Sequence, residues 1–191
     1  MSVILQGADA PTAGEGATVT IGVAIPVPEP YGKQLQRWRG HFGDPLADAI
    51  PAHVTLLPPS AVPVAAMPEV RRHLTTVAAS HGRFNVHLRG TGTFRPVSPV
   101  VFVQLAEGVS QCELLEQSVR SGLLARDVNF YYHPHVTVAH HLDDGALDRA
   151  FDTLAAFEAR FTVDSFSLYE HGVDGVWRPV QCFPFAAGSL R

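Results

Sequence analysis

Hydrophobic residues follow two different periods along this chain. In residues 83–92 they alternate with polar residues, as in a strand with one buried face, whereas in residues 67–82 they recur every three or four positions, as on one face of a helix. The same criteria predict further strands at 17–28, at 98–108 and in two short segments that begin at residues 53 and 135. They predict helices at 28–43, 67–82, 108–125 and 143–161.

Turn residues mark where several of these elements end. Pro58 and Pro59 are expected to close the strand that begins at residue 53, because proline cannot donate a hydrogen bond to a sheet. The dipeptide Asp174-Gly175 predicts the turn of a closing hairpin over 161–185. Strands and helices therefore alternate in two similar halves, a pattern that predicts an α+β fold with antiparallel sheets.

Composition and charge exclude several classes of protein. A formal charge of −4 argues against binding of long duplex nucleic acid, which requires a basic face. The sequence contains no uncharged apolar run near the roughly 20 residues of a membrane span. Its two cysteines have no metal-type spacing, and the cytoplasm is the expected compartment. Residues 1–17 lack the features of a signal peptide and are expected to form a disordered leader, followed by one domain over 18–191.

Histidine is the unusual component of this sequence. There are 10 histidines against 14 lysines and arginines combined, and histidine titrates near neutrality, which indicates proton transfer or metal binding. Two of them begin the same tetrapeptide, His-Val-Thr-aliphatic, at residues 53–56 and 135–138. At the composition of this chain, about 0.02 such tetrapeptides are expected by chance, so the pair calls for a chemical explanation.

A third His-x-Thr triplet, at residues 73–75, serves as an internal control. It lies in the predicted helix 67–82, where residues two apart point in different directions and cannot share a ligand. His73 is therefore expected to be a solvated helix residue.

In a strand the geometry is reversed, because side chains alternate between the two faces. His53 and Thr55 are expected to share one face, and so are His135 and Thr137. Each motif would then present an imidazole and a hydroxyl together from an otherwise apolar strand. In the alternative interpretation the motifs have no functional role, and each histidine is a half-buried strand residue with a local hydrogen bond.

Two His-x-Thr motifs on strands in the two halves of an α+β chain resemble the two-histidine (2H) phosphoesterase superfamily, which includes the LigT-like RNA ligases and cyclic phosphodiesterases. Gly90–Phe94 and the closing hairpin are similar to further family segments, so the resemblance covers about residues 18–186. It implies a bilobal fold: two antiparallel sheets with flanking helices, related by a pseudo-twofold axis, with the active-site cleft between the lobes. The chain departs from the family at His140, where many LigT-like members carry arginine.

The motifs suit the cleavage of a phosphodiester bond. Opening a 2′,3′-cyclic phosphate or cleaving a 2′–5′ linkage requires one group to deprotonate the attacking oxygen and another to protonate the departing ribose oxygen. Two histidines with pKa values near the ordinary value of about 6.5 can do both if one is neutral and the other protonated. We therefore predict His53 and His135 as the acid–base pair, and Thr55 and Thr137 as donors to phosphate oxygens. This chemistry requires no metal ion or other cofactor.

Four further residues are weaker candidates for substrate binding. Phe94 and Tyr132 are candidates to stack on a nucleobase, and Arg95 and His140 are candidates to bring positive charge to the phosphate. The trio of His133, His135 and His140 also permits a metal site, but no Asp, Glu or Cys lies beside it at a recognised spacing.

The sequence thus predicts a metal-independent phosphodiesterase that acts as a monomer on nucleotides or RNA ends, with neither a membrane nor long duplex nucleic acid as a partner. Two alternatives stay open at this point. One is a catalytically silent module that binds nucleotides or RNA ends on the same fold. The other is a metal-dependent hydrolase built on the histidine cluster.

Overall fold

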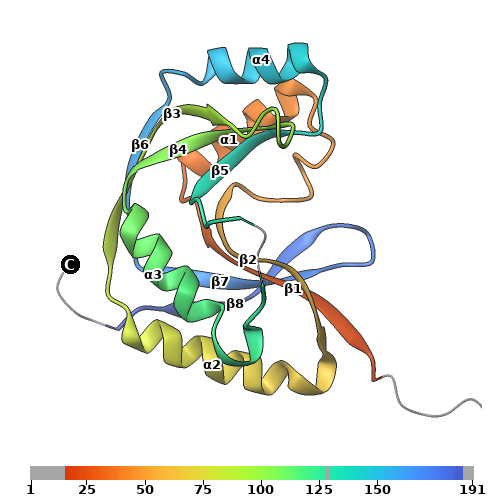
Figure 1. The fold of residues 1–191 in the computed structure, drawn as a ribbon, viewed down its shortest axis with the longest axis vertical. Coiled ribbons are helices and arrows are strands. Elements are labelled where there is room, and N and C mark those ends of the chain that lie inside the picture. Colours follow the sequence, from red (N-terminus) through yellow and green to blue (C-terminus); the bar gives the residue numbers. More distant parts are fainter. Residues whose placement is uncertain (1–15, 128–129, 187–191) are drawn as a thin grey trace, which may run out of the picture.

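Eight strands form the sheet around which the described part of the chain, residues 16–127 and 130–186, is built in this computed structural model (Figure 1). The strands are β1 (Thr18–Pro26), β2 (His53–Pro63), β3 (Phe84–Thr93), β4 (Val100–Glu107), β5 (His135–His140), β6 (Glu158–Val163), β7 (Ser165–His171) and β8 (Trp177–Pro184). Neighbouring strands pair antiparallel in the order β6-β3-β4-β5-β2-β1-β7-β8. The two strands that carry the His-Val-Thr motifs, β2 and β5, therefore lie side by side at the centre.

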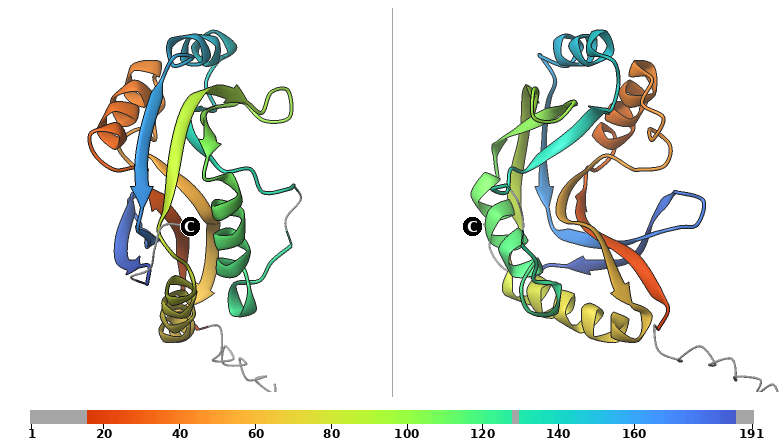
Figure 2. Two further views of the ribbon diagram at one scale, coloured as in Figure 1. Left: turned by 90° about the vertical axis from the view of Figure 1, so that its left-hand side faces the viewer. Right: turned by 45° about the vertical axis from the view of Figure 1, so that its right-hand side comes forward.

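Four α-helices pack on this strongly curled sheet (Figure 2). They are α1 (Tyr31–Phe42), α2 (Met67–Ser80), α3 (Val109–Val119) and α4 (Asp144–Thr153), with short 3-10 helices at Val64–Ala66 and Gly122–Leu124. Helix α1 packs on β5 and α3 packs on β2, so each covers the motif strand of the other half of the chain. The longest described helix, α2, has 14 residues, and no described helix is long and apolar enough to cross a bilayer.

The structure confirms the α+β class and the antiparallel pairing, but its eight strands belong to one sheet rather than two. Reading outward from the centre, one half is β5-β4-β3-β6 and the other is β2-β1-β7-β8. They join through one registered pair, Val54 with Val136, and both valines are at most 1% exposed. The bilobal shape and the pseudo-twofold axis stay predictions.

Strand β2 is longer than the sequence predicts, because it does not end at its prolines. It continues through Pro58 and Pro59 to Pro63. The register of β1 against β2 shifts here, so that the single residue Gly22 lies opposite both prolines. A bulge of this kind tolerates residues that cannot donate to the sheet, and the prediction that the two prolines close the strand is wrong.

Two predicted helices are shorter than expected. Helix α3 ends at Val119, shortly before Gly122, whose φ of +56° lies in the left-handed region. Helix α4 ends at Thr153, and residues 158–161 at the end of the predicted helix instead belong to β6, which pairs with β3. The segment Glu158–Val163 alternates polar and apolar residues, as a strand with one buried face does, and the edge of β3 offers unpaired backbone groups to it. The predicted hairpin is confirmed as β7 and β8.

The control histidine also lies in a different setting from the one expected. His73 is half-buried, and its Nε2 donates a hydrogen bond to the carbonyl of Val119 at 3.1 Å, at the end of α3. The last carbonyls of a helix have no partner within the helix, so a side chain from a packed neighbour is a natural donor. The expectation of a solvated His73 is therefore wrong. His73 lines neither of the two cavities described below.

The predicted leader falls almost wholly outside the described residues, which begin at Gly16. Strand β1 begins two residues later, at Thr18, and the bounds of the domain stay a prediction.

Candidate active site

The two motifs face each other across the centre of the sheet. Val54 and Val136 point into the core, so the residues on either side of each valine lie on the opposite face of the sheet. Antiparallel pairing at this position places His53 across from Thr137, and Thr55 across from His135. All four of these side chains are half-buried.

The imidazoles of both motifs are held in the same way. Nδ1 of His53 lies 2.6 Å from the carbonyl oxygen of Pro51, and Nδ1 of His135 lies 2.7 Å from that of His133. A carbonyl oxygen only accepts hydrogen bonds, so Nδ1 carries the proton in both rings and Nε2 of the neutral ring keeps its lone pair. Each histidine is thus prepared to act through Nε2, with its tautomer set by the backbone two residues earlier.

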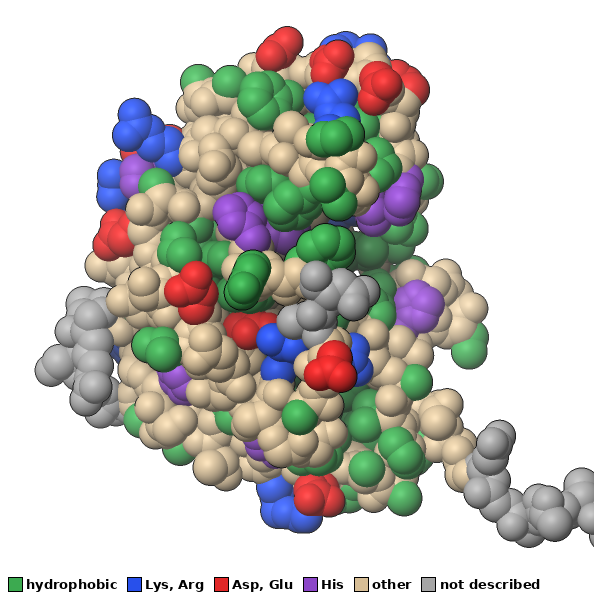
Figure 3. All heavy atoms as spheres, in the orientation of Figure 1, with side chains coloured by type: hydrophobic (Ala, Val, Ile, Leu, Met, Phe, Trp, Pro, Cys, Tyr) green, Lys and Arg blue, Asp and Glu red, His purple; other side chains and the backbone are tan. Residues whose placement is uncertain are grey.

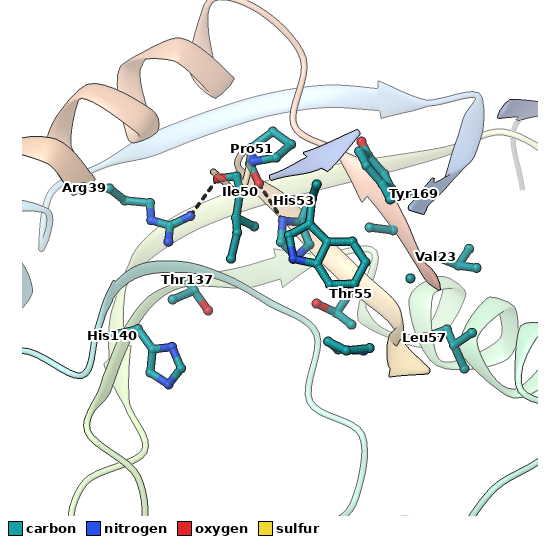
Figure 4. A pocket seen from close by; sticks show the side chains of 14 residues that line it. Val23, Arg39, Ile50, Pro51, His53, Thr55, Leu57, Thr137, His140 and Tyr169 are labelled. Atoms are coloured by element: carbon teal, nitrogen blue, oxygen red, sulfur yellow. Dashed lines mark hydrogen bonds between the residues drawn. The ribbon is translucent and has the colours of Figure 1, made fainter. Parts of the chain in front are cut away.

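Two cavities open beside the motifs, and Thr55 lines both of them. The Trp177 cavity has a volume of about 200 Å³ (Figure 4). Its lining includes the motif residues His53, Thr55 and Thr137. Residues outside the motifs also line it, among them His140, Arg39, Tyr169 and Trp177. The Tyr132 cavity, of about 840 Å³, is lined by residues that include Thr55, His135, Phe94, His133, Tyr132 and Tyr131. Histidine side chains gather across the middle of the face shown in Figure 3, where the surface is hollowed.

A bulge in β5 brings His140 to the motif. Thr137 pairs with Phe102 and Ala139 pairs with Val101, so Val138 is an extra residue on β5. Strict alternation would place His140 on the face opposite to Thr137, but the extra residue reverses the alternation and both side chains line the Trp177 cavity. Strand β2 has a register shift at the same place, directly after its motif threonine.

Burial favours the neutral form of both motif imidazoles. It lowers the pKa of His53 below the ordinary value of about 6.5, and Arg39 adds to this effect, while the hydrogen bond to Pro51 opposes it. Burial likewise lowers the pKa of His135, and the neighbouring His133 and His53 add smaller effects of the same sign, against the opposing bond to His133. Burial also lowers the pKa of His140.

Three of the four weaker candidates lie with the motifs. The Phe94 ring lies 5.0 Å from that of His135 in an edge-to-face arrangement and lines the Tyr132 cavity. The Tyr132 hydroxyl donates to the carbonyl of Thr55 at 2.9 Å, and burial raises the pKa of Tyr132 far above its usual range. His140 lines the Trp177 cavity, as described above.

The structure does not bring Arg95 to this group. Its guanidinium contacts Asp148 at 2.7 Å and Asp144 at 3.5 Å, both on α4, and it lines neither cavity. The sequence places Arg95 directly after Phe94, but in the loop between β3 and β4 the two side chains lie in different surroundings.

Among the residues that line the Trp177 cavity, a charged residue, Arg39, and two aromatic residues, Tyr169 and Trp177, are not candidates from the sequence. For Arg39 a signal exists, because it lies four residues after Leu35 on the buried face of α1, where a charge is unusual. Tyr169 and Trp177 lie on β7 and β8, and no local pattern indicates that this hairpin reaches the motifs.

The described residues include no group of three or more His, Cys, Asp or Glu side chains positioned to hold a metal ion. The rings of His133 and His135 are 6.2 Å apart and lie against the Tyr132 cavity, whereas His140 lines the Trp177 cavity.

Comparisons with known proteins show the family and the fold of this chain. Residues 27–175 match the 2′-5′ RNA ligase superfamily. A candidate phosphoesterase of Bacillus cytotoxicus is 26% identical over 148 residues, which cover 76% of this chain and 86% of that protein. A candidate phosphoesterase of Bacillus cereus is 24% identical with the same coverage.

Solved structures of Escherichia coli LigT share the fold. The complex with 3′-AMP has a TM-score of 0.65 at 18% identity, covering 89% of this chain and 99% of LigT. The complex with ATP has a TM-score of 0.64 at 22% identity, with the same coverage. Together with a family match that spans most of the sequence, this likeness of fold leads to one conclusion: the chain belongs to the 2′-5′ RNA ligase superfamily of 2H phosphoesterases.

Proposed function

We propose that this protein is a metal-independent phosphodiesterase that acts on 2′,3′-cyclic phosphates or 2′–5′ phosphodiester bonds of nucleotides or RNA ends. His53 and His135 are its acid–base pair. The observation that carries the proposal is the matched pair of Nδ1 hydrogen bonds to carbonyls two residues earlier, on adjacent strands, which leaves Nε2 of each ring available for proton transfer.

The two proton transfers need different protonation states. One neutral histidine takes the proton of the attacking water or ribose hydroxyl, and the other, protonated, gives its proton to the departing ribose oxygen. Burial lowers both pKa values, which favours the neutral form of each ring before substrate binds. The negative charge of a bound phosphodiester favours an imidazolium beside it, so substrate binding itself supplies the acid. Which histidine becomes the acid is left open.

The threonines complete the site. Thr55 and Thr137 donate hydrogen bonds to the non-bridging oxygens of the phosphate and stabilise the charge that develops there. Their position across the strand pair from His135 and His53 supports this role, since each hydroxyl then lies beside the opposite imidazole.

The cavities suit the organic part of a nucleotide. Aromatic side chains line both of them, among them Phe94 and Tyr132 in one and Trp177 in the other, and aromatic rings are favourable surfaces for nucleobases. We propose that His140 adds a polar contact to the phosphate. Complexes of LigT with 3′-AMP, ATP and NADP+ support a nucleotide ligand for the fold.

The experiment that tests the proposal is hydrolysis of 2′,3′-cyclic mononucleotides and of 2′–5′-linked dinucleotides by the purified protein in EDTA. We expect turnover of at least one substrate class with chelator present. Activity that disappears in EDTA and returns with zinc or manganese would favour a metal-dependent hydrolase instead. Nucleotide binding without turnover would identify the silent binding module.

A further inference from the structure

Three successive carbonyls directly before the first motif each accept a hydrogen bond from a different part of the molecule. The carbonyl of Ala49 accepts from the backbone N–H of Trp177 at 2.9 Å. The carbonyl of Ile50 accepts from Nη1 of Arg39 at 2.9 Å and also from Nε2 of Gln36, on the same helix, at 3.0 Å. The carbonyl of Pro51 accepts from Nδ1 of His53 at 2.6 Å. The carbonyl that sets the tautomer of His53 thus belongs to a segment held from β8 and α1.

Arg39 is itself held by a buried carboxylate. Its Nε and Nη2 donate to Oδ2 of Asp44 at 3.0 and 2.8 Å, and the two residues are only 3% and 4% exposed. A buried ion pair has a large desolvation cost, so it is weak evidence for a role in stability alone. Arg39 lies in the wall of the Trp177 cavity, beside the segment that carries the first motif (Figure 4).

We propose that Arg39, held by Asp44, is a positioning residue for His53. One side of the guanidinium binds Asp44 and the other holds the Ile50 carbonyl, which fixes the plane of the peptide between Ile50 and Pro51. The pyrrolidine ring fixes φ of Pro51, so only its ψ is then free to move the Pro51 carbonyl. With that carbonyl in place, Nδ1 of His53 stays protonated and Nε2 is directed into the Trp177 cavity.

The planar guanidinium is suited to this task and a lysine is not. An arginine presents donors in a rigid fork, so it can bind a carboxylate on one edge and a carbonyl on another at the same time, whereas a lysine is a point charge on a flexible chain. The same occupied fork argues against a direct contact of Arg39 with substrate phosphate, because Asp44 already binds two of its nitrogens.

The charge of Arg39 has a second effect that can be separated from positioning. The charged or titratable groups around His53 are Arg39, His140 and Tyr169 in the Trp177 cavity, His135 on the neighbouring strand, and Asp44, which binds Arg39. Arg39 favours the neutral form of His53. A substitution that removes the charge therefore shifts the pH profile, while one that keeps the charge but loses the fork does not.

The test compares Arg39→Met, Arg39→Lys and the control Arg37→Met by two readouts. The first is the tautomer of His53, from ¹⁵N NMR of histidine-labelled protein, which requires no turnover. The second readout is kcat and KM across pH, measured with whichever substrate of the proposed screen the wild type turns over. Arg37 is exposed on the same helix, and its Nε donates to the carbonyl of Lys33 within that helix. All variants are first checked for a cooperative thermal melt.

We expect Arg39→Met and Arg39→Lys to lower kcat by about 10–100-fold with KM changed by less than threefold, because misplacing a catalytic group by about 1 Å costs on this order. The Nδ1–H tautomer of His53 should lose population in both variants. The limb of the pH profile that belongs to His53 should move to higher pH in Arg39→Met only. Arg37→Met should match the wild type.

Three results would overturn the proposal: full activity in Arg39→Lys, an unchanged His53 tautomer in Arg39→Met, or a KM that rises tenfold at constant kcat, which would make Arg39 a phosphate ligand. If Arg39→Met does not fold, Asp44→Asn replaces it, with an expected threefold to tenfold loss of kcat. The kinetic readout rests on the proposed function. If the wild type shows no turnover, that function fails, and the tautomer measurement still tests Arg39.

Discussion

The two motif regions have the same tripeptide and the same Nδ1 hydrogen bond, but their surroundings differ. His53 depends on a carbonyl segment that is held by polar contacts, including the buried pair of Arg39 and Asp44. His135 is surrounded by aromatic rings, with Phe94 and Phe102 centred 5.0 and 5.1 Å from the imidazole. Polar contacts specify direction closely, whereas aromatic packing excludes water and tolerates small movements. Equivalent residues in a repeated motif therefore need not respond equally to a change in their neighbours.

The largest expected effect comes from the histidines themselves. Replacing His53 or His135 with Ala should lower kcat by roughly 10²–10⁴, the usual contribution of a positioned proton-transfer group. The loss of kcat in the double variant should be much smaller than the product of the two single losses, because the effects of groups that act together are not additive. Steady-state kinetics of the four proteins tests this expectation.

His73→Ala is the control for these variants, because His73 belongs to the same kind of triplet on a helix. We expect its turnover to stay within twofold of the wild type, and its melting temperature to fall, since the hydrogen bond between α2 and α3 is lost. An equal loss of turnover in His73→Ala and His135→Ala, with the fold intact, would contradict the assignment of the motifs.

The motif threonines should show the next largest effect. Thr55→Ala and Thr137→Ala should each lower kcat by about 10–10³, as expected for one lost contact to the charged transition state. Thr55→Ser and Thr137→Ser retain the hydroxyl and should recover most of this loss. If serine proves as damaging as alanine, then the methyl group, and hence packing, is what the site requires.

A smaller effect on kcat is expected for the aromatic rings around His135. Phe94→Leu removes the aromatic ring that packs against His135. We expect kcat to fall about tenfold, because the orientation of the imidazole becomes less well defined. Phe161→Leu is the matched control, since Phe161 is a half-buried ring on β6 that contacts Tyr31 and lines neither cavity. A rise in KM alone for Phe94→Leu would mean that this ring stacks on the substrate and does not orient His135.

The pH dependence of stability reports on the two motif histidines without any substrate. The pKa values of His53 and His135 are lowered on folding, so below about pH 6.5 the unfolded chain binds protons that the folded chain does not. The free energy of unfolding should therefore fall as pH decreases from about 6.5 towards the lower pKa values of the folded state, by up to about 1 kcal/mol per histidine and pH unit.

Thermal melts at pH 7.5 and 5.5 measure this fall in stability. The double variant with both His53→Asn and His135→Asn should lose less stability on acidification than the wild type. An equally steep fall in the double variant would assign the effect to other histidines.

The smallest effect is expected for Arg95. Arg95→Gln removes an exposed ion pair with Asp148, and such pairs contribute little to stability, so the melting temperature should change by less than about 2 °C. Turnover should stay within twofold of the wild type, because Arg95 points to α4 and away from both motif regions. A tenfold rise in KM would mean that Arg95 leaves α4 to bind the phosphate.

Much of the fold follows from local patterns. The alternation in residues 83–92 and the helical stripe in 67–82 are properties of neighbouring residues, and both elements form as predicted. The pairing of each motif histidine with its threonine on one face also follows from the strand period alone. The failures occur where a distant partner decides, as at Pro58 and Pro59, which stay within β2 because a register shift places both prolines opposite Gly22 of β1.

The sequence by itself determined the α+β class and the two motifs, because period and motif identity are encoded in short stretches of chain. Tertiary structure alone decided that β2 and β5 are neighbours, that a bulge places His140 beside Thr137, and that Arg39 rather than Arg95 lies in the cavity. Strand order, register and the packing of a helix on a distant strand depend on contacts between residues far apart in the chain. A pattern read along the sequence contains no information about such contacts until the sheet is assembled.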